Sequence, residues 1–309
     1  MTKIATREAY GKALAKLICE DERIVVLDAD LTKSTKTSDA KQACPERHFN
    51  IGIAEANMMS IAAGLAASGK IVYASSFAMF AAGRAFEQVR NSICYSNLNV
   101  KICATHAGIT LGEDGATHQS VEDIALMRAI PNMQVIQPCD GKETEEVIKA
   151  VIDIKGPVFV RLGRSAVETI HGDDYQFHFG KGEILRKGTD VAIFATGLMV
   201  QEALKASETL LELGLDCSVI NMPTIKPIDK ELIIEMAKTH THLVSCEEHN
   251  VLAGFGSAIA EVLIENYPKK MMIIGIQDTF GESGKPADLL DKYGLSARKL
   301  VDRIKVLKH

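Results

Sequence analysis

The stretch that decides the fold of this chain is residues 104–119, ATHAGITLGEDGATHQ. It follows a strand-like run at 99–103, NVKIC, and precedes an amphipathic segment that we expect to form a helix from about Ser120. A loop between a strand and the following helix is where open α/β sheets usually place their ligands. The stretch therefore predicts an α/β fold with a candidate site in this loop.

The composition of the loop suits a functional site. Its three glycines let the backbone turn tightly or approach a ligand, and His106, Asp114 and His118 are short, polar and titratable. A capped surface loop with solvated charges would account for the same residues equally well. From this segment alone, both interpretations stay open.

The totals describe an ordinary globular protein. With 309 residues, 47% of them hydrophobic, the chain is long enough for two domains. A net charge of −5 and the lack of a basic cluster argue against nucleic acid or a membrane as partner. The seven cysteines are scattered without a Cys-x-x-Cys pair, which suggests neither a zinc site nor a disulfide framework. No apolar run has signal-peptide or transmembrane length, and we expect a cytoplasmic protein.

Strand-like and helix-like segments alternate, which predicts βα units and mainly parallel sheets. In the first half we expect helices at 6–20, 54–68, 79–93, 120–129 and 141–153, with strands at 24–27, 70–74, 99–103, 133–136 and 158–161. In the second half we expect strands at 191–195, 216–220, 242–246 and 271–275, with helices at 198–213, 229–238 and 255–266. Between the halves the chain turns polar and rich in glycine. We therefore predict two consecutive three-layer α/β domains, at 1–165 and 190–309, joined by a linker at 166–189 that holds one short strand.

Glu55 stands at the first turn of an expected apolar helix, in the sequence IGIAEANM. A carboxylate there complements the helix dipole, and for an isolated glutamate that interpretation would be preferred. The helix behind it is nearly free of charge, however. A lone acid entering such a buried environment is suited to proton chemistry.

Glu55 and the loop at 104–119 together resemble the pyrimidine-binding half of the thiamine diphosphate enzymes of the transketolase family. Four segments occur in the order and approximate spacing of that family: 28–32 DADLT, 52–58 GIAEANM, 76–80 SFAMF and 112–119 GEDGATHQ. One such match would be weak evidence, whereas four in register are strong evidence. The second half resembles the C-terminal domain of the family, including 245–250 SCEEHN, where we expect Glu247 to His249 to make core or interface hydrogen bonds.

The resemblance implies a set of residues that bind the cofactor. In the family, the glutamate that matches Glu55 hydrogen-bonds the aminopyrimidine ring of thiamine diphosphate and promotes its imino tautomer. Phe77 and Phe80 match aromatics that pack this ring, although core packing is the commoner role of such residues. Asp30 matches a further acid on the cofactor side. Where the family often has a third aromatic, this chain has Gly83.

The resemblance also implies a set of residues that bind a phosphorylated sugar. His106 and His118 match histidines that face the substrate and help to move protons, and Asp114 matches a residue that contacts a substrate hydroxyl. The residues that match the phosphate-binding set are Arg7, Ser34 and Arg164. Arginine suits this task because its planar fork can bind two phosphate oxygens at once.

One module of the family has no match in this sequence. The diphosphate and metal module carries a Gly-Asp-Gly motif, which is absent here. The resemblance therefore implies that a separate N-terminal subunit supplies the diphosphate site and the Mg²⁺ ligands, and that two copies of each chain form an α₂β₂ assembly around a homodimer of this one. We predict no metal site in this chain: the groups at 171–174 and 240–242 are expected to be surface residues without a supporting cluster.

The leading hypothesis is transfer of a two-carbon ketol unit from a phosphorylated ketose to an aldose. A 1-deoxyxylulose-5-phosphate synthase shares much of the pattern, but that family usually has Asp-Arg-Ala-Gly where this chain has Thr-His-Ala-Gly at 105–108. A β-subunit of a 2-oxo acid dehydrogenase would not be expected to keep the phosphate-binding set. A non-catalytic binding or regulatory subunit is the alternative from another class. The joint presence of Glu55, His106, Asp114 and His118 argues against it.

Overall fold

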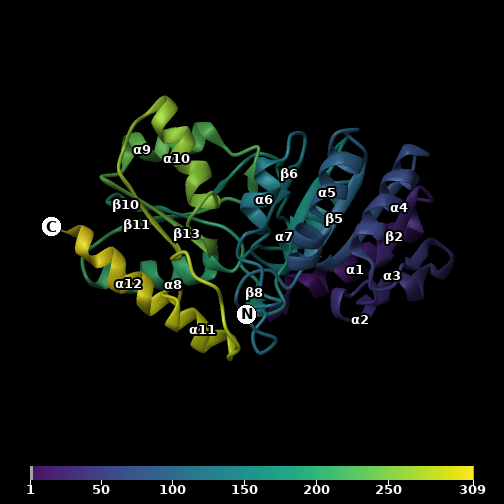
Figure 1. The fold of residues 1–309 in the computed structure, drawn as a ribbon. Helices are drawn as coiled ribbons and strands as arrows, with labels where there is room; N and C mark the ends of the chain where they lie inside the picture. Colours follow the sequence, from purple (N-terminus) through teal and green to yellow (C-terminus); the bar gives the residue numbers. More distant parts are fainter. Residues whose placement is uncertain (1–2, 309) are drawn as a thin grey trace.

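The computed structural model describes residues 3–308, which form two halves, each built around its own sheet (Figure 1). The first sheet has seven strands in the order β12-β6-β7-β5-β4-β2-β3, and the second has five in the order β14-β13-β10-β11-β9. Neighbouring strands are parallel except at one edge of each sheet, where β12 pairs with β6 and β9 pairs with β11 in antiparallel fashion. The predicted class, two α/β units with mainly parallel sheets, is confirmed.

The strands of the first sheet are β2 (Ile24–Asp28), β3 (His48–Asn50), β4 (Ile71–Phe77), β5 (Val100–Thr105), β6 (Gln134–Ile136), β7 (Val158–Arg161) and β12 (Thr224–Lys226). The helices around it are α1 (Thr6–Glu20), α2 (Thr32–Thr35), α3 (Ser38–Ala43), α4 (Glu55–Ala67), α5 (Phe86–Gln88), α6 (Asp123–Ala129) and α7 (Gly141–Ala150), with a 3₁₀ turn at Pro45–Arg47. Helices α1, α3 and α7 share one hydrophobic cluster with the sheet, whereas α4 and α6 share another. The sheet is therefore the middle of three layers.

The second sheet contains β9 (Glu183–Arg186), β10 (Val191–Ala195), β11 (Cys217–Asn221), β13 (His242–Asn250) and β14 (Met271–Ile276). Its helices are α8 (Met199–Glu212), α9 (Lys230–Thr239), α10 (Phe255–Asn266), α11 (Pro286–Lys292) and α12 (Ala297–Ile304), followed by a 3₁₀ turn at Lys305–Lys308. Helices α8 and α12 pack on one face, and α9 and α10 belong to the cluster that also contains α4 and α6. One hydrophobic core thus runs through both halves.

Local sequence explains the elements that were predicted well. Every residue of β2 is buried, as expected of a central parallel strand whose two faces are both covered. Helix α1 buries a stripe of residues three and four apart, from Ala9 to Ile18, and spans the predicted 6–20. Helix α10 likewise matches the predicted 255–266. None of the helices within residues 3–308 is long and apolar enough to cross a membrane.

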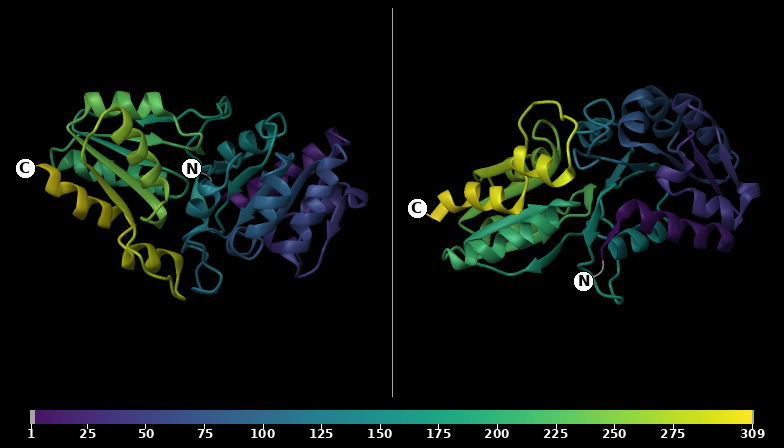
Figure 2. Two further views of the ribbon diagram at one scale, coloured as in Figure 1. Left: turned by 45° about the horizontal axis from the view of Figure 1, so that its top comes forward. Right: turned by 90° about the horizontal axis from the view of Figure 1, so that it is seen from below.

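Long-range pairing explains the differences from the prediction. Strand β12 comes from the second half of the chain but completes the edge of the first sheet beside β6. A two-stranded sheet joins β1 (Lys3–Ala5) to β8 (Ala166–Glu168), so that the start of the chain lies at the junction of the halves (Figure 2). The expected linker holds β8 and β9 rather than one strand. We retain 1–165, 166–189 and 190–309 as proposed boundaries.

Two predicted helices differ in form. The helix expected at 79–93 consists of two π-helical segments, Met79–Arg84 and Val89–Cys94, separated by the short α5. The helix expected from Ser120 begins only at Asp123. Residues 120–122 precede the helix, and the carbonyl of Ser120 accepts a hydrogen bond of 2.8 Å from the Gly108 amide instead of a helical one.

Candidate active site

The predicted site residues collect at the carboxyl edge of the first sheet. Strands β2, β4, β5 and β7 are parallel neighbours, so the segments that follow them leave the sheet at the same edge. Asp30 follows β2, Phe77 ends β4, His106 follows β5 and Arg164 follows β7. Arg7 reaches this edge from the start of α1, where it contacts His106.

Glu55 is buried, with 2% of its surface exposed, as the first residue of α4. It is not the lone acid that the sequence suggested, because Nη1 of Arg84 donates to both carboxylate oxygens at 3.0 and 3.2 Å. Arg84 ends the π-helical segment Met79–Arg84, and such segments occur frequently at functional sites. Sequence reasoning missed Arg84 because it expected an ordinary helix there.

The two aromatic residues lie beside the acid and the histidines. The rings of Phe77 and Phe80 are nearly parallel, with centroids 5.9 Å apart. Phe77 stacks on His106 at 3.8 Å, and Phe80 meets His118 edge-on at 5.3 Å. The guanidinium of Arg84 lies 4.5 Å from the centre of the Phe80 ring. These contacts link the expected cofactor-binding and substrate-binding residues into one continuous group.

Position 83 offers no third aromatic wall. A Cβ atom on Gly83 would lie 2.3 Å from the Cε of Met79, so a larger residue there would require Met79 to move. The side chain that covers Phe80 is instead that of Arg84, the residue after Gly83. A guanidinium cation therefore lies over one face of this ring.

His106 is held in a single bonding pattern. Its backbone is left-handed, with φ of 60°. Nε2 lies 3.2 Å from Nη1 of Arg7, and Nδ1 lies 2.8 Å from Oγ1 of Thr105. A guanidinium can only donate, so Nε2 accepts and the ring proton resides on Nδ1. Burial, followed by the charges of Arg7 and Arg164 and by His118, lowers the pKa of His106 to about 3.

The three residues of the expected phosphate-binding set surround this histidine in part. Nη1 of Arg7 also donates to the backbone carbonyl of Ser34 at 2.8 Å. Arg164 donates to the carbonyl of Leu111 and, at 3.3 Å, to the carboxylate of Glu113. Burial and the charge of Arg164 lower the pKa of Arg7. Two guanidinium groups thus act on each other beside His106, which favours an anion here.

The remaining predicted residues lie at the margin of this group. Asp30 is exposed, with a left-handed backbone, and it exchanges two hydrogen bonds with Asn50. Asp114 is exposed at the tip of the loop, on the stretch that also carries His118. His118 is half-buried, and its Nδ1 lies 2.9 Å from Oγ1 of Thr117.

The expectation that His171 lies at the surface was wrong. Its side chain is buried between Asp140, 3.0 Å from Nδ1, and Glu183, 3.0 Å from Nε2. Burial alone would lower the pKa of this imidazole, but its hydrogen bonds to the two carboxylates outweigh that effect and raise the pKa to about 10. His240 is buried as well, with Nε2 2.8 Å from Oγ of Ser218.

His171 also belongs to a cluster that the sequence did not predict. Potential ligand atoms of Cys139, Asp140 and His171 lie within 4.8 Å of one another. Protein groups already satisfy the carboxylate, since Asp140 caps α7 and accepts hydrogen bonds from the backbone amides of Ile170 and His171. The geometry therefore shows a structural network that ties α7 to the linker.

Comparison with known proteins places the whole chain in one family. Residues 2–169 match the model of the transketolase pyrimidine binding domain, and residues 180–300 match that of the transketolase C-terminal domain. A protein described as a transketolase C-terminal section, from Methanocaldococcus jannaschii, is 51% identical over 96% of this chain and 94% of its own length. The 6-deoxy-6-sulfo-D-fructose transketolase subunit of Clostridium sp. is 41% identical over 96% of this chain and 92% of its own length.

A solved structure gives the same assignment. The structure of a split gene transketolase, an inactive beta4 tetramer, superimposes with a TM-score of 0.90 and 51% identity over the full length of both chains. The chain described here therefore belongs to the transketolase family and corresponds to its C-terminal half, the pyrimidine-binding domain followed by the C-terminal domain.

Proposed function

We propose that this chain is the C-terminal subunit of a split, thiamine diphosphate-dependent transketolase, which transfers a two-carbon ketol unit from a phosphorylated ketose to an aldose. The observation that carries the proposal is one continuous group of side chains. It runs from the buried carboxylate of Glu55 through Arg84 to Phe80 and His118, and from there to Phe77, His106 and the cationic Arg7. An acid beside aromatic rings and a cationic pocket for phosphate are both required by such a reaction.

The residues on this chain suit the pyrimidine end of the cofactor. A buried carboxyl group can share a proton with a ring nitrogen, and flat rings can pack against Phe77 and Phe80. Glu55 and these two rings would hold the aminopyrimidine, with Asp30 at the margin on the cofactor side. When bound, thiamine diphosphate would supply the nucleophilic carbon and the electron sink that transfer between sugars requires.

The side chains around His106 would bind and orient the sugar. Arg7 and Arg164 hold phosphate oxygens through their planar forks, assisted by the hydroxyl of Ser34. His106, whose pKa is lowered to about 3, meets the substrate as a neutral ring, and its Nε2 exchanges the contact with Arg7 for a substrate hydroxyl. Proton transfer to and from the substrate hydroxyls then falls to His118. Asp114 contacts a hydroxyl near the reacting carbon.

The diphosphate and its Mg²⁺ are proposed to bind on a separate N-terminal subunit. Mg²⁺ prefers an octahedral set of oxygen ligands. The cluster of potential metal ligands found within residues 3–308 offers instead the thiol of Cys139 and the imidazole of His171 beside one carboxylate. The inactive beta4 tetramer of the split gene relative supports the need for a second kind of subunit. We propose an α₂β₂ assembly around a homodimer of this chain.

A reconstitution assay tests the proposal. Ketol transfer from xylulose 5-phosphate to ribose 5-phosphate is measured with thiamine diphosphate and Mg²⁺, for this chain alone and for its mixture with the candidate N-terminal subunit. We expect activity in the mixture and none in the chain alone. Decarboxylation of pyruvate by the mixture without sugar transfer would contradict the proposal in favour of the synthase or dehydrogenase relatives. Inactivity in both assays would favour a non-catalytic subunit.

A further inference from the structure

The loop that carries His106 and His118 is anchored first within its own half of the molecule. The amide of Ala107 donates to the carbonyl of Leu162 at 3.2 Å, and the amide of Gly108 donates to the carbonyl of Ser120 at 2.8 Å. The second of these bonds closes the base of the loop two residues from each histidine. The carbonyls that follow Gly108 also accept hydrogen bonds from the first half, from Gln119 to Ile109 and from Ser165 to Thr110. The amide of Thr110 takes its partner from elsewhere.

The second sheet supplies that partner through β13. Oε1 of Glu248 accepts a hydrogen bond of 2.6 Å from the amide of Thr110. The same carboxyl group fills the space beside Gly108, where an added Cβ would lie 2.3 Å from it and where φ is +79°. The approach therefore requires a glycine on the loop and an acceptor oxygen at position 248 on β13.

Arg161 connects this contact to the far end of the loop. Its guanidinium is fully buried and bonds the carboxylate of Asp123 at 2.7 and 3.1 Å. Nη2 also donates to the carbonyls of Ser120 and Glu248, at 3.2 and 3.1 Å. One buried cation thus ties β7, the start of α6 and β13 together underneath the loop.

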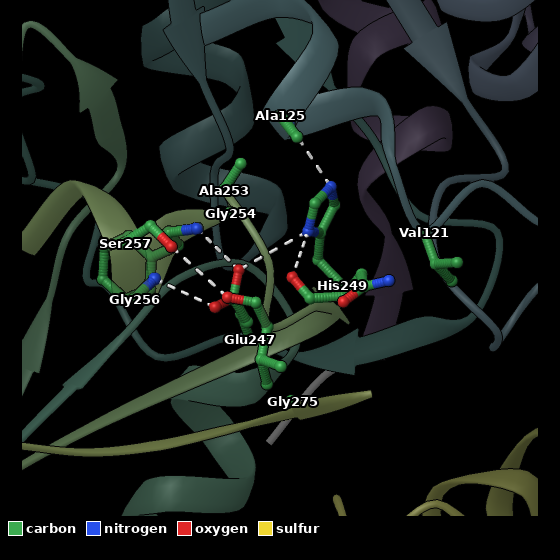
Figure 3. Close-up of polar contacts among 12 residues, drawn as sticks. Val121, Ala125, Glu247, His249, Ala253, Gly254, Gly256, Ser257 and Gly275 are labelled. Carbon is green, nitrogen blue, oxygen red and sulfur yellow. Dashed lines mark hydrogen bonds and ion pairs between the residues drawn. The ribbon is translucent and has the colours of Figure 1, made fainter. Parts of the chain in front are cut away.

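The neighbouring acid, Glu247, has a different task although it lies on the same strand. Successive residues of a strand face opposite sides of the sheet. Glu247 accepts hydrogen bonds of 2.6 and 2.9 Å from the amides of Phe255 and Gly256 at the start of α10 (Figure 3). Its surroundings are as dry as those of Glu248, since the two residues are 0% and 4% exposed. The hydrogen bonds expected of this segment from the sequence are confirmed.

We propose that Glu248 is a positioning residue for the candidate active site: it holds residues 108–110 and thereby sets the left-handed backbone of His106. The proposal rests on the proposed function in so far as His106 faces the substrate. The proposal gives the C-terminal domain a part in the reaction, because Glu248 lies on β13 of that domain. Glu248 itself contacts none of the residues expected to bind the substrate or the cofactor. Its effect is transmitted through the Thr110 amide and the loop backbone.

The expected effect follows from what each substitution leaves behind. Alanine at position 248 removes the acceptor, so the Thr110 amide loses its partner and the loop gains freedom beside Gly108. Glutamine keeps an oxygen in the same place and should restore most of the contact. Small displacements of reacting groups lower turnover by about 100-fold in enzymes. The loss should therefore fall on kcat more than on KM.

The experiment compares Glu248→Ala and Glu248→Gln with the matched control Glu247→Gln. Hydrogen exchange, followed by mass spectrometry on the isolated chain, reports the amides of 106–120 and of 254–258 separately. We expect Glu248→Ala to speed exchange in 106–120 by about tenfold or more, whereas Glu247→Gln speeds exchange only in 254–258. In the reconstituted complex, kcat of Glu248→Ala should fall about tenfold or more with KM changed less than threefold, and Glu248→Gln should recover most of kcat.

Either of two results would overturn the proposal. One is exchange in 106–120 that stays at the wild-type rate in both Glu248 variants. The other is faster exchange there with kcat no lower than that of Glu247→Gln. Because the exchange measurement needs no partner or substrate, it is decisive for the loop contact even if the wild-type mixture has no transferase activity. A lack of transferase activity in the wild-type mixture would count against the proposed function alone.

Discussion

Two buried histidines in this molecule have pKa values that their neighbours shift in opposite directions. His106, at the candidate active site, is 2% exposed and lies against Arg7, with Arg164 nearby. His171, in the linker, is 8% exposed and lies between two carboxylates. Burial disfavours the imidazolium in both places. The cations around His106 add to that effect and bring its pKa to about 3, whereas the carboxylates around His171 reverse it and bring the pKa to about 10.

The difference separates a site from a scaffold. Around His171 each ring nitrogen has an acidic partner, Asp140 at the start of α7 and Glu183 on β9, and these bonds join α7 to the linker. Around His106 two guanidinium groups lie near a neutral ring, and the carboxylate bonded to Arg164 is the exposed Glu113, so this region favours the binding of an anion. The sign of the charges around each buried histidine therefore distinguishes the candidate active site from the His171 network, whereas burial is similar in both.

The largest expected difference between the two histidines is in turnover. His106→Ala removes a hydrogen-bonding group beside the substrate and should lower kcat/KM of the reconstituted complex by about 100-fold or more. His171→Gln changes a network that touches no expected substrate group and should leave kcat/KM within about threefold of wild type. Steady-state ketol transfer measures both. Comparable losses in the two variants would remove the distinction between site and scaffold.

The order reverses for stability. His171→Gln removes an ion that two carboxylates surround, and should lower the free energy of unfolding by about 1–3 kcal/mol at neutral pH. His106→Gln replaces a neutral ring that lies beside cations, and should change the free energy of unfolding by less than about 1 kcal/mol. Urea denaturation of the isolated chain provides the comparison. A larger loss for His106→Gln would contradict the assigned charge states.

The contribution of His171 to the free energy of unfolding should decrease as the solution becomes alkaline. Its pKa is raised from 6.5 when unfolded to about 10 when folded, so its stabilisation is complete below pH 6.5 and is lost as pH rises toward about 10. The gap in unfolding free energy between wild type and His171→Gln should narrow over that window. A gap that is constant with pH would show that the native imidazole is neutral.

His106 should give the smallest effect, with the opposite sign. Its pKa is lowered from 6.5 to about 3, so wild-type stability gains from this residue as pH rises through that window and falls as the solution becomes acidic. His106→Gln should flatten the acid side of the stability curve. Titration of the ring by NMR provides an independent check, and protonation of His106 near pH 6.5 would refute the assigned pKa.

Much of the fold could be predicted because its elements are encoded locally. The apolar run of β2 and the periodic faces of α1 and α10 are complete signals within their own segments. Strand β12 could not be foreseen, since its partner β6 lies 88 residues earlier in the chain (Thr224 pairs with Ile136) and three residues carry little pattern. The π-helical segments at 79–94 likewise depend on packing against α4 and α6.

The candidate site divides in the same way. Glu55, His106 and His118 stand in short motifs, and their proposed roles come from the resemblance to the family rather than from the residues alone. Arg84 and Glu248 could not be predicted, because each acts on a segment far away in sequence: Arg84 on Glu55 and Glu248 on Thr110. The burial of His171 escaped prediction for a similar reason, since its acidic partners lie 31 residues before it, at Asp140, and 12 residues after it, at Glu183.

We propose that this chain supplies the pyrimidine side of a shared active site through Glu55. The most direct test is turnover of the complex reconstituted with Glu55→Ala, after gel filtration has shown that the variant still assembles with the N-terminal subunit. Gln119→Ala is not a suitable control because it lies in the loop, whereas Glu247→Gln alters an equally buried acid away from the site. We predict that Glu55→Ala abolishes ketol transfer while Glu247→Gln retains it. Full activity of Glu55→Ala in an assembled complex would contradict the account.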